Sequence, residues 1–485
     1  MNDDLTRLYR TIGFNGPLPS DATRTAVAAA TAVQASDPAE LPPLDAAGLD
    51  QLEAMLDRHP RKTLTRMRAL VDAELTEAQL RVAIARARQA LAAPREAVAA
   101  IQADAAFFAA AVPALPPDFI FDGMDLNELP INPADRKFEN DDLAGMFGWV
   151  FGAGPFVLTQ PRRETFRFHN EPRFPSRFIY ELADPTPAAP LEIALFSDFG
   201  VGRYYSKYIA KQLRTRRFPY AIHLGDVYYA GRRSEFAEYF EALLDPLLAD
   251  TSLFALNSNH EMYSGGVPYF DYLSKRAVLQ PVRQKQEGSY FCLRSQRFQI
   301  VGIDTAFFGQ GRYREPALLE WLQEVLRFGR ETGRVNVLLS ADHPYRYGER
   351  GLTKLLNRDL KSLVLDERLA DLWFWGNTHY CALFNHSAEL PFVGSCIGHA
   401  GYPYDTIKPG KSAPAPLLFL ETQARFPAAT NLRQDRGNNG YCVLQLNADG
   451  SLGLKYWDWM SHPRFAAKLT RATAGAPLQV TPVNF

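Results

Sequence analysis

Four apolar, strand-like runs between residues 191 and 379 each stop at a cluster of polar residues. The runs end at Ser197-Asp198, Gly225-Asp226, Asn259-His260-Glu261 and Gly376-Asn-Thr-His379. In an open α/β sheet the carboxyl ends of parallel strands lie at one edge, where loops carry ligands and the strands hold those loops rigid. The endings therefore predict one polar site built from residues that are far apart in the sequence.

The segment between residues 191 and 375 alternates apolar strands with amphipathic helices. Such alternation requires right-handed crossovers and gives a parallel sheet covered by helices. An expected hairpin, 290–294 with 298–303, makes the sheet mixed. The strands are predicted at 191–197, 220–224, 253–257, 335–340 and 372–375, and further β structure is predicted between 383 and 457.

The chain of 485 residues exceeds one ordinary domain. Residues 1–115 are alanine-rich, and Leu49, Leu52, Met55 and Leu56 fit one helix face, which predicts an N-terminal α-helical domain. That domain carries no candidate chemistry, so we expect a packing or oligomerisation module. A proline-rich connecting segment is predicted at 116–190, the main α/β domain at 191–460, and a C-terminal tail at 461–485.

Composition and charge restrict the function classes. Hydrophobic residues make up 47% and charged residues 22% of the chain, as in soluble globular proteins. A net charge of −1 gives no reason to expect nucleic acid or a membrane surface as partner. The N-terminus shows no basic region followed by an apolar core, and no apolar run is long enough to cross a bilayer.

The four cysteines lie in apolar or strand-like segments and form no CxxC pair. We interpret them as buried free thiols, which favours a reducing compartment and predicts a cytoplasmic protein. They are Cys292, Cys381, Cys396 and Cys442.

The polar residue types at the strand ends favour a metal site. A single aspartate after a strand is commonly a helix N-cap, and a single buried histidine is commonly a core residue. Two aspartates, Asp198 and Asp226, on neighbouring strands repel each other unless a cation or a proton lies between them. Carboxylate, phenol and amide oxygens combined with imidazole suit Fe, Mn or Zn.

The ordered motifs resemble those of the calcineurin-like metallophosphoesterases, and the Gly-Asp-x-x-Tyr form resembles the purple acid phosphatase branch. The resemblance covers about residues 190–460. It implies a four-layer α/β/β/α sandwich with mixed sheets, and hydrolysis of phosphate esters by a metal-activated water. The motifs are Asp198-Phe-Gly200, Gly225-Asp226-Val-Tyr-Tyr229, Asn259-His260-Glu261, His343 and Gly376-Asn-Thr-His379.

Carried over by position, the resemblance assigns Asp198, Tyr229 and His379 to a first metal, expected to be iron because of the tyrosine. Asp226 would bridge to a second metal, Mn or Zn. Asn259 and His343 would be ligands of that second metal. His260 would protonate the leaving oxygen or steady the transition state. The expected substrate is a phosphorylated small molecule or protein.

The second-metal half departs from the family pattern. Asn377 stands where the family has the first histidine of Gly-His-x-His, and Ser258 stands where it has a glycine. Ala341 and Asp342 displace His343 from its usual place directly after the strand. Two interpretations therefore stay open. One is a hydrolytic enzyme, and the other is a degenerate metal-binding member that acts as a non-hydrolytic scaffold or a mononuclear metalloprotein.

Overall fold

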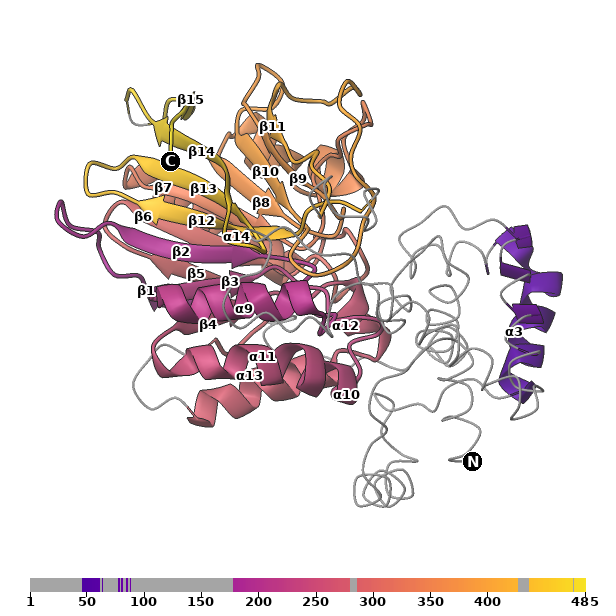
Figure 1. Ribbon diagram of the computed structural model, residues 1–485. Helices are drawn as coiled ribbons and strands as arrows, with labels where there is room; N and C mark the ends of the chain where they lie inside the picture. The colour runs from indigo at the N-terminus through magenta and orange to yellow at the C-terminus, as the bar shows by residue number, and fades with distance from the viewer. Residues whose placement is uncertain are drawn as a thin grey trace.

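The computed structural model describes residues 46–61, 178–279, 286–425, 436–473 and 475–485, together with a few positions between 63 and 88. Two sheets stack against each other, with helices on their outer faces (Figure 1). No helix among these residues is long and apolar enough to cross a membrane.

The first sheet has seven strands in the order β15-β14-β13-β12-β2-β3-β4. β2, β3 and β4 are parallel, as the strand–helix alternation predicts, and β12 joins the other side of β2 in the antiparallel sense. The strands are β2 (Leu191–Phe196), β3 (Tyr220–His223), β4 (Ser252–Ala255), β12 (Gly440–Leu446), β13 (Leu452–Asp458), β14 (Pro463–Thr470) and β15 (Gln479–Pro482).

The second sheet has eight strands in the order β1-β5-β6-β7-β8-β10-β9-β11. The predicted hairpin forms from β5 and β6, and β6, β7, β8 and β10 are parallel. The strands are β1 (Ile179–Glu181), β5 (Phe291–Arg294), β6 (Phe298–Ile303), β7 (Val335–Ser340), β8 (Leu372–Trp375), β9 (Cys381–Phe384), β10 (Val393–Ile397) and β11 (Leu417–Leu420).

Alternating side chains divide the core into layers. Ile193 and Leu195 of β2 point between the sheets, where they meet residues such as Leu339 of β7. Ala194 and Phe196 point outward and pack under helices. Helices on both outer faces complete the four-layer α/β/β/α sandwich, which confirms the predicted fold class.

The helices over the seven-stranded sheet are α9 (Tyr204–Arg216), a continuous stretch formed by α10 (Arg233–Phe236), η4 (Ala237–Glu241), α11 (Ala242–Leu244) and η5 (Asp245–Ala249), and α13 (Val267–Leu279). The helices over the eight-stranded sheet are α14 (Pro316–Glu331), η6 (Leu355–Asp359) and η7 (Lys361–Asp366). α14 begins with Pro316 in its first turn and buries Leu318, Leu322 and Val325 on one face. Each fully buried leucine contributes about 1.5–3 kcal/mol to the free energy of folding.

Two predicted boundaries differ from the structure. The segment predicted as a C-terminal tail contains β14 and β15, which extend the seven-stranded sheet through antiparallel pairing with β13. The physical reason is that Ala467 and Leu469 alternate into the core between the sheets. Between β7 and β8, where the strand–helix alternation predicts a helix, the chain forms the two π-helices η6 and η7.

The N-terminal region is described only in part. α3 (Ala46–Arg58) buries Leu49, Leu52 and Leu56, the face predicted from their spacing, while Met55 is half-buried. The predicted connecting segment up to residue 177 lies outside the described residues.

The cysteine prediction is confirmed, because Cys292, Cys381, Cys396 and Cys442 are all buried and free.

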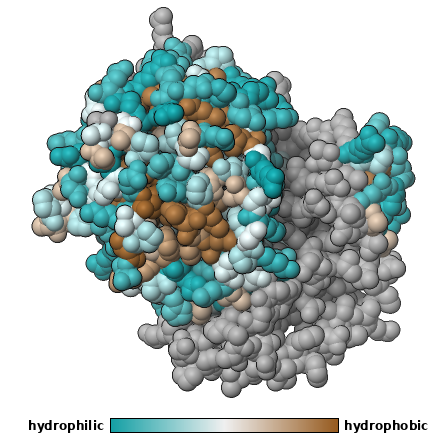
Figure 2. All heavy atoms as spheres, turned by 90° about the horizontal axis from the view of Figure 1, so that it is seen from above, coloured by the Kyte–Doolittle hydropathy of each residue, from teal (hydrophilic) through white to brown (hydrophobic). Residues whose placement is uncertain are grey.

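On the surface, Figure 2 shows one face of the molecule where hydrophobic side chains gather in a patch framed by hydrophilic ones.

Candidate metal centre

The polar strand endings of both sheets meet at one place. β2 ends in Ser197-Asp198, β3 in Gly225-Asp226, and β8 of the other sheet in Gly376-Asn377. A Cβ atom on Gly376 would lie 1.9 Å from Oγ of Ser197 and 2.8 Å from Oδ2 of Asp198. Only glycine allows this approach, so Gly376 lets the β8 loop bring its polar residues against those of β2.

Three buried side chains form a group that fits a metal ion. Asp198, Asp226 and His379 each offer one ligand atom, and these atoms lie within 4.8 Å of one another. Within the described parts of the chain, this is the one such group of three or more His, Cys, Asp or Glu side chains. We call these three residues the metal group.

The hydroxyl of Tyr228 lies in the middle of the metal group. It is 2.9 Å from Oδ1 of Asp198, 3.0 Å from Oδ2 of Asp226 and 2.9 Å from Nε2 of His379. Nε2 of His379 is in turn 3.2 Å from Oδ1 of Asp198. Four donor atoms of the types that hold iron, manganese or zinc therefore lie side by side.

The separations between these four atoms fit one six-coordinate ion. Neighbouring ligands of an octahedral ion with bonds of about 2.1 Å lie roughly 3 Å apart. The four separations given above run from 2.9 to 3.2 Å. Asp198, Asp226, Tyr228 and His379 are therefore near enough to one another to hold one ion.

The structure brings Tyr228, and not the predicted Tyr229, against the two aspartates. The two tyrosines lie in the turn that follows β3. The backbone N–H of Tyr229 donates to Oε1 of Glu235, and its backbone carbonyl lies 2.7 Å from Nδ1 of His260. Its phenol has Tyr402 and Tyr239 as electrostatic neighbours, and burial raises its pKa well above 10.

Backbone conformation also distinguishes this place. Seven non-glycine residues in the described parts of the chain have a positive φ, and four of them belong to the loops of the centre. Such conformations are uncommon for residues with a side chain and concentrate at functional sites. The four are Asp198 (φ 60°), Asp226 (φ 82°), Asn377 (φ 60°) and His379 (φ 48°).

The electrostatics of the metal group favour a cation. Burial alone would raise the pKa of Asp198, but the hydrogen bond and charge of His379 outweigh it and hold that pKa well below its usual range. Burial and the negative charge of Asp198 raise the pKa of Asp226 well above its usual range. Two buried carboxylates this close require a proton or a cation between them.

His260 lies beside the metal group, at the start of α12 (Asn259–Tyr263). Its ring centroid is 4.3 Å from that of Tyr228. Burial lowers the pKa of His260 to about 3, so the imidazole is neutral at neutral pH. Because Nδ1 is directed at the Tyr229 carbonyl, that carbonyl fixes the orientation of the ring.

The residues predicted as ligands of a second metal do not belong to the metal group. Nδ2 of Asn259 donates to the Tyr263 hydroxyl at 2.7 Å, and Oδ1 of Asn259 is buried without a hydrogen-bond partner among the described residues. His343 does not belong to the metal group, and burial lowers its pKa to about 4. The residue before it, Asp342, instead accepts a hydrogen bond of 3.1 Å from Nδ2 of Asn377.

Three residues of the centre were not among the predicted site residues: Tyr228, Ser258 and Asp342. Because Tyr228 and Tyr229 are adjacent, the sequence alone does not decide which tyrosine lies at the metal group. Asp342 directly precedes the predicted ligand His343, and its carboxylate is a second possible metal ligand there. Ser258 contacts Oδ1 of Asp226, which the sequence signals only by the absence of the expected glycine.

The comparisons with known proteins agree with this geometry. A model of the calcineurin-like phosphoesterase family matches residues 191–381. These residues belong to the calcineurin-like phosphoesterase family. The matched phosphoesterase segment contains every residue of the metal group, and it covers less than half of the chain.

Two solved structures are similar to part of the chain. A purple acid phosphatase, PPD1, isolated from yellow lupin (Lupinus luteus) seeds, is 15% identical over 58% of this chain and 54% of its own, with a TM-score of 0.43. GAP50, the anchor in the inner membrane complex of Plasmodium, is 12% identical over 59% of this chain and 91% of its own, with a TM-score of 0.44. The matched region thus spans about half of the lupin enzyme. No curated protein sequence matches the chain.

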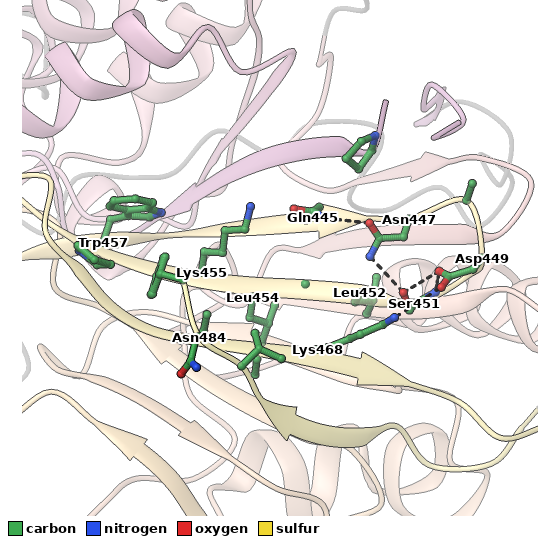
Figure 3. Close-up of a pocket in the computed structure, with 18 of the residues that line it drawn as sticks. Gln445, Asn447, Asp449, Ser451, Leu452, Leu454, Lys455, Trp457, Lys468 and Asn484 are labelled. Carbon is green, nitrogen blue, oxygen red and sulfur yellow. Dashed lines mark hydrogen bonds and ion pairs between the residues drawn. The ribbon is translucent and has the colours of Figure 1, made fainter. Parts of the chain in front are cut away.

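A separate hollow of about 1010 Å³ lies on strands β12, β13 and β14 of the seven-stranded sheet (Figure 3). Asn447, Asp449 and Ser451 form a hydrogen-bonded rim at one end, and Trp457 lies at the other. None of its lining residues belongs to the metal group, so it is a different place on the molecule.

Proposed function

We propose that the chain hydrolyses phosphate esters at the metal centre. The observation that supports this most strongly is the buried set of Asp198, Asp226, Tyr228 and His379, at the end of parallel strands of a calcineurin-like phosphoesterase domain. A bound metal ion lowers the pKa of water and polarises a phosphoryl oxygen.

The chain's own residues position the reaction. The Asn377 backbone N–H donates to Oδ2 of Asp198 at 2.9 Å, which fixes the orientation of that carboxylate. His260, neutral and directed by the Tyr229 carbonyl, presents Nε2 beside the centre. In this proposal the negative charge of a bound phosphate ester raises the proton affinity of the ring, so Nε2 takes a proton from solvent water and passes it to the leaving oxygen, or the ring steadies the transition state.

The proposal also covers the metal, the substrate class, the location and the association of the chain. Phenol, carboxylate and imidazole together favour iron, as in the purple acid phosphatase branch, with manganese or zinc as substitutes. The substrate class is a phosphorylated small molecule or protein, the location is cytoplasmic, and association is through the N-terminal helices.

The test is hydrolysis of p-nitrophenyl phosphate and bis-p-nitrophenyl phosphate by protein loaded with iron, manganese or zinc. Asp226→Asn removes a ligand, and we expect kcat/KM to fall more than about 100-fold, because loss of an outer-shell partner alone costs 10–100-fold. The matched control is Asp271→Asn, which loses only a surface ion pair with Arg233. A metal-loaded protein that hydrolyses neither ester would favour the non-hydrolytic scaffold instead.

A further inference from the structure

Tyr402 lies on the loop that follows β10, and a backbone hydrogen bond holds this loop against the loop that follows β2. The Tyr402 N–H donates to the Asp198 carbonyl at 2.7 Å. Gly401 permits this close approach, because a Cβ there would lie 2.3 Å from the Phe199 carbonyl oxygen. The position of Tyr402 is therefore fixed relative to Asp198, a member of the metal group.

The ring of Tyr402 contacts the rings of two donors of the metal centre. Its centroid lies 4.3 Å from that of Tyr228 and 4.4 Å from that of His379, and the interplanar angle is 31° in both pairs. The Tyr228 and His379 centroids are 6.1 Å apart, whereas the Tyr228 hydroxyl and Nε2 of His379 are 2.9 Å apart. The two donor side chains thus converge at their tips, and Tyr402 packs against the ring of each.

A second contact fixes the Tyr402 loop to the seven-stranded sheet. Nδ2 of Asn439, the residue before β12, donates to the Tyr402 carbonyl at 3.2 Å and to the His399 carbonyl at 2.9 Å. Tyr402 and Asn439 are both fully buried. Protein interiors are close-packed, so a buried ring whose backbone is held at both its N–H and its carbonyl has little room to turn.

The contacts of Tyr402 bear on how an ion would be held. Side chains lose rotamer freedom when they are immobilised by binding, and this loss weakens binding. A ring that already holds two donor side chains together removes part of that loss in advance, as the outer-shell partners of metal ligands do.

We infer that Tyr402 is a positioning residue of the metal centre, whose ring holds the Tyr228 phenol and the His379 imidazole in the orientation in which both donor atoms reach one ion. Tyr402 acts through these two side chains. The inference rests on the metal centre of the proposed function, but it concerns how tightly and in what geometry an ion is held, and not whether an ester is cleaved.

The experiment titrates the metal-free full chain with Mn²⁺ by calorimetry and records the absorption spectrum of the iron-loaded protein. Tyr402→Leu removes the ring, and we expect Mn²⁺ to bind about 10–100-fold more weakly, the effect of losing an outer-shell partner. We also expect the tyrosinate-to-ferric absorption band to shift in wavelength, because the Tyr228 phenol can then change its angle to the ion. Tyr402→Phe keeps the ring and should match the wild type in both measurements.

The matched control is Phe419→Leu on β11, which deletes a ring stacked on Phe465 with centroids 4.8 Å apart and an interplanar angle of 8°. We expect this variant to lose stability and to keep the Mn²⁺ affinity and the absorption band of the wild type. A loss of Mn²⁺ affinity in Phe419→Leu as large as in Tyr402→Leu would show a general effect of core packing and would overturn the inference.

Three further results would also overturn the inference: wild-type Mn²⁺ affinity in Tyr402→Leu, an unshifted band in Tyr402→Leu, or an equal loss of affinity in Tyr402→Phe. If Tyr402→Leu does not fold, Asn439→Ala decides, because it releases the loop and keeps the ring. We expect weaker Mn²⁺ binding in Asn439→Ala, and wild-type affinity there would contradict the inference. An absorption band that depends on Tyr402 in protein that hydrolyses no ester would overturn the proposed function alone.

Discussion

The Tyr228 hydroxyl lies 2.9 Å from Nε2 of His379, although 151 positions separate the two residues in the sequence. Tyr228 follows a strand of the seven-stranded sheet, and His379 follows β8 of the eight-stranded sheet. The contact joins the two halves of the sandwich at the metal group.

Replacing Tyr228 by phenylalanine should remove a metal ligand. In iron-loaded protein we expect the tyrosinate-to-ferric absorption band to disappear in Tyr228→Phe and to persist in Tyr229→Phe, because only the Tyr228 hydroxyl contacts Asp198 and Asp226. The two variants delete the same atom from adjacent residues, so each is the control of the other. Loss of the band in Tyr229→Phe alone would return the ligand to the position first predicted.

Adding one methyl group at Gly376 should push the loop that follows β8 away from the loop that follows β2. The new Cβ in Gly376→Ala would lie 1.9 Å from Ser197 Oγ, so we expect the free energy of unfolding to fall by about 1–3 kcal/mol, as overpacking does, with loss of metal binding. Gly351→Ala is the control, because no atom lies within 4 Å of a Cβ there. Denaturant unfolding should show a change within about 0.5 kcal/mol for the control. Equal stability of the two variants would contradict the close approach.

His260 should affect turnover more than metal content. We expect His260→Asn to lower kcat by about 10²–10⁴, the usual contribution of a general acid, with an unchanged metal count. His386→Asn, on a half-buried histidine away from the centre, should leave kcat unchanged. A wild-type kcat in His260→Asn would show that the ring only packs against Tyr228.

The fold class followed from patterns that are strong in the sequence. Strands such as 335–340 and 372–375 are apolar throughout because both of their faces are buried, and their predicted bounds match β7 and β8. β14 was missed because Lys468 and Thr470 are exposed and interrupt its apolar pattern, so the strand is recognisable only from its pairing with β13.

The metal ligands were predictable from the sequence where a motif contains a single residue able to bind a metal. Asp198, Asp226 and His379 are each the single strong ligand at a strand end, and the structure brings them together. The tyrosine was ambiguous because Tyr228 and Tyr229 are neighbours, and local backbone direction decides between them. The network of Asp342 and Asn377 depends on contacts between β7 and β8 loops that no local pattern encodes.

A bound ion would have a mechanical consequence for the sandwich. Its ligands lie on loops of two different sheets, so the ion would cross-link segments 151 residues apart. Because the ion would bind the closed sandwich and not the separated sheets, its binding free energy would oppose separation of the sheets. The colour of an iron-loaded centre would then vanish when the sheets part, which makes the metal a reporter of the closed sandwich.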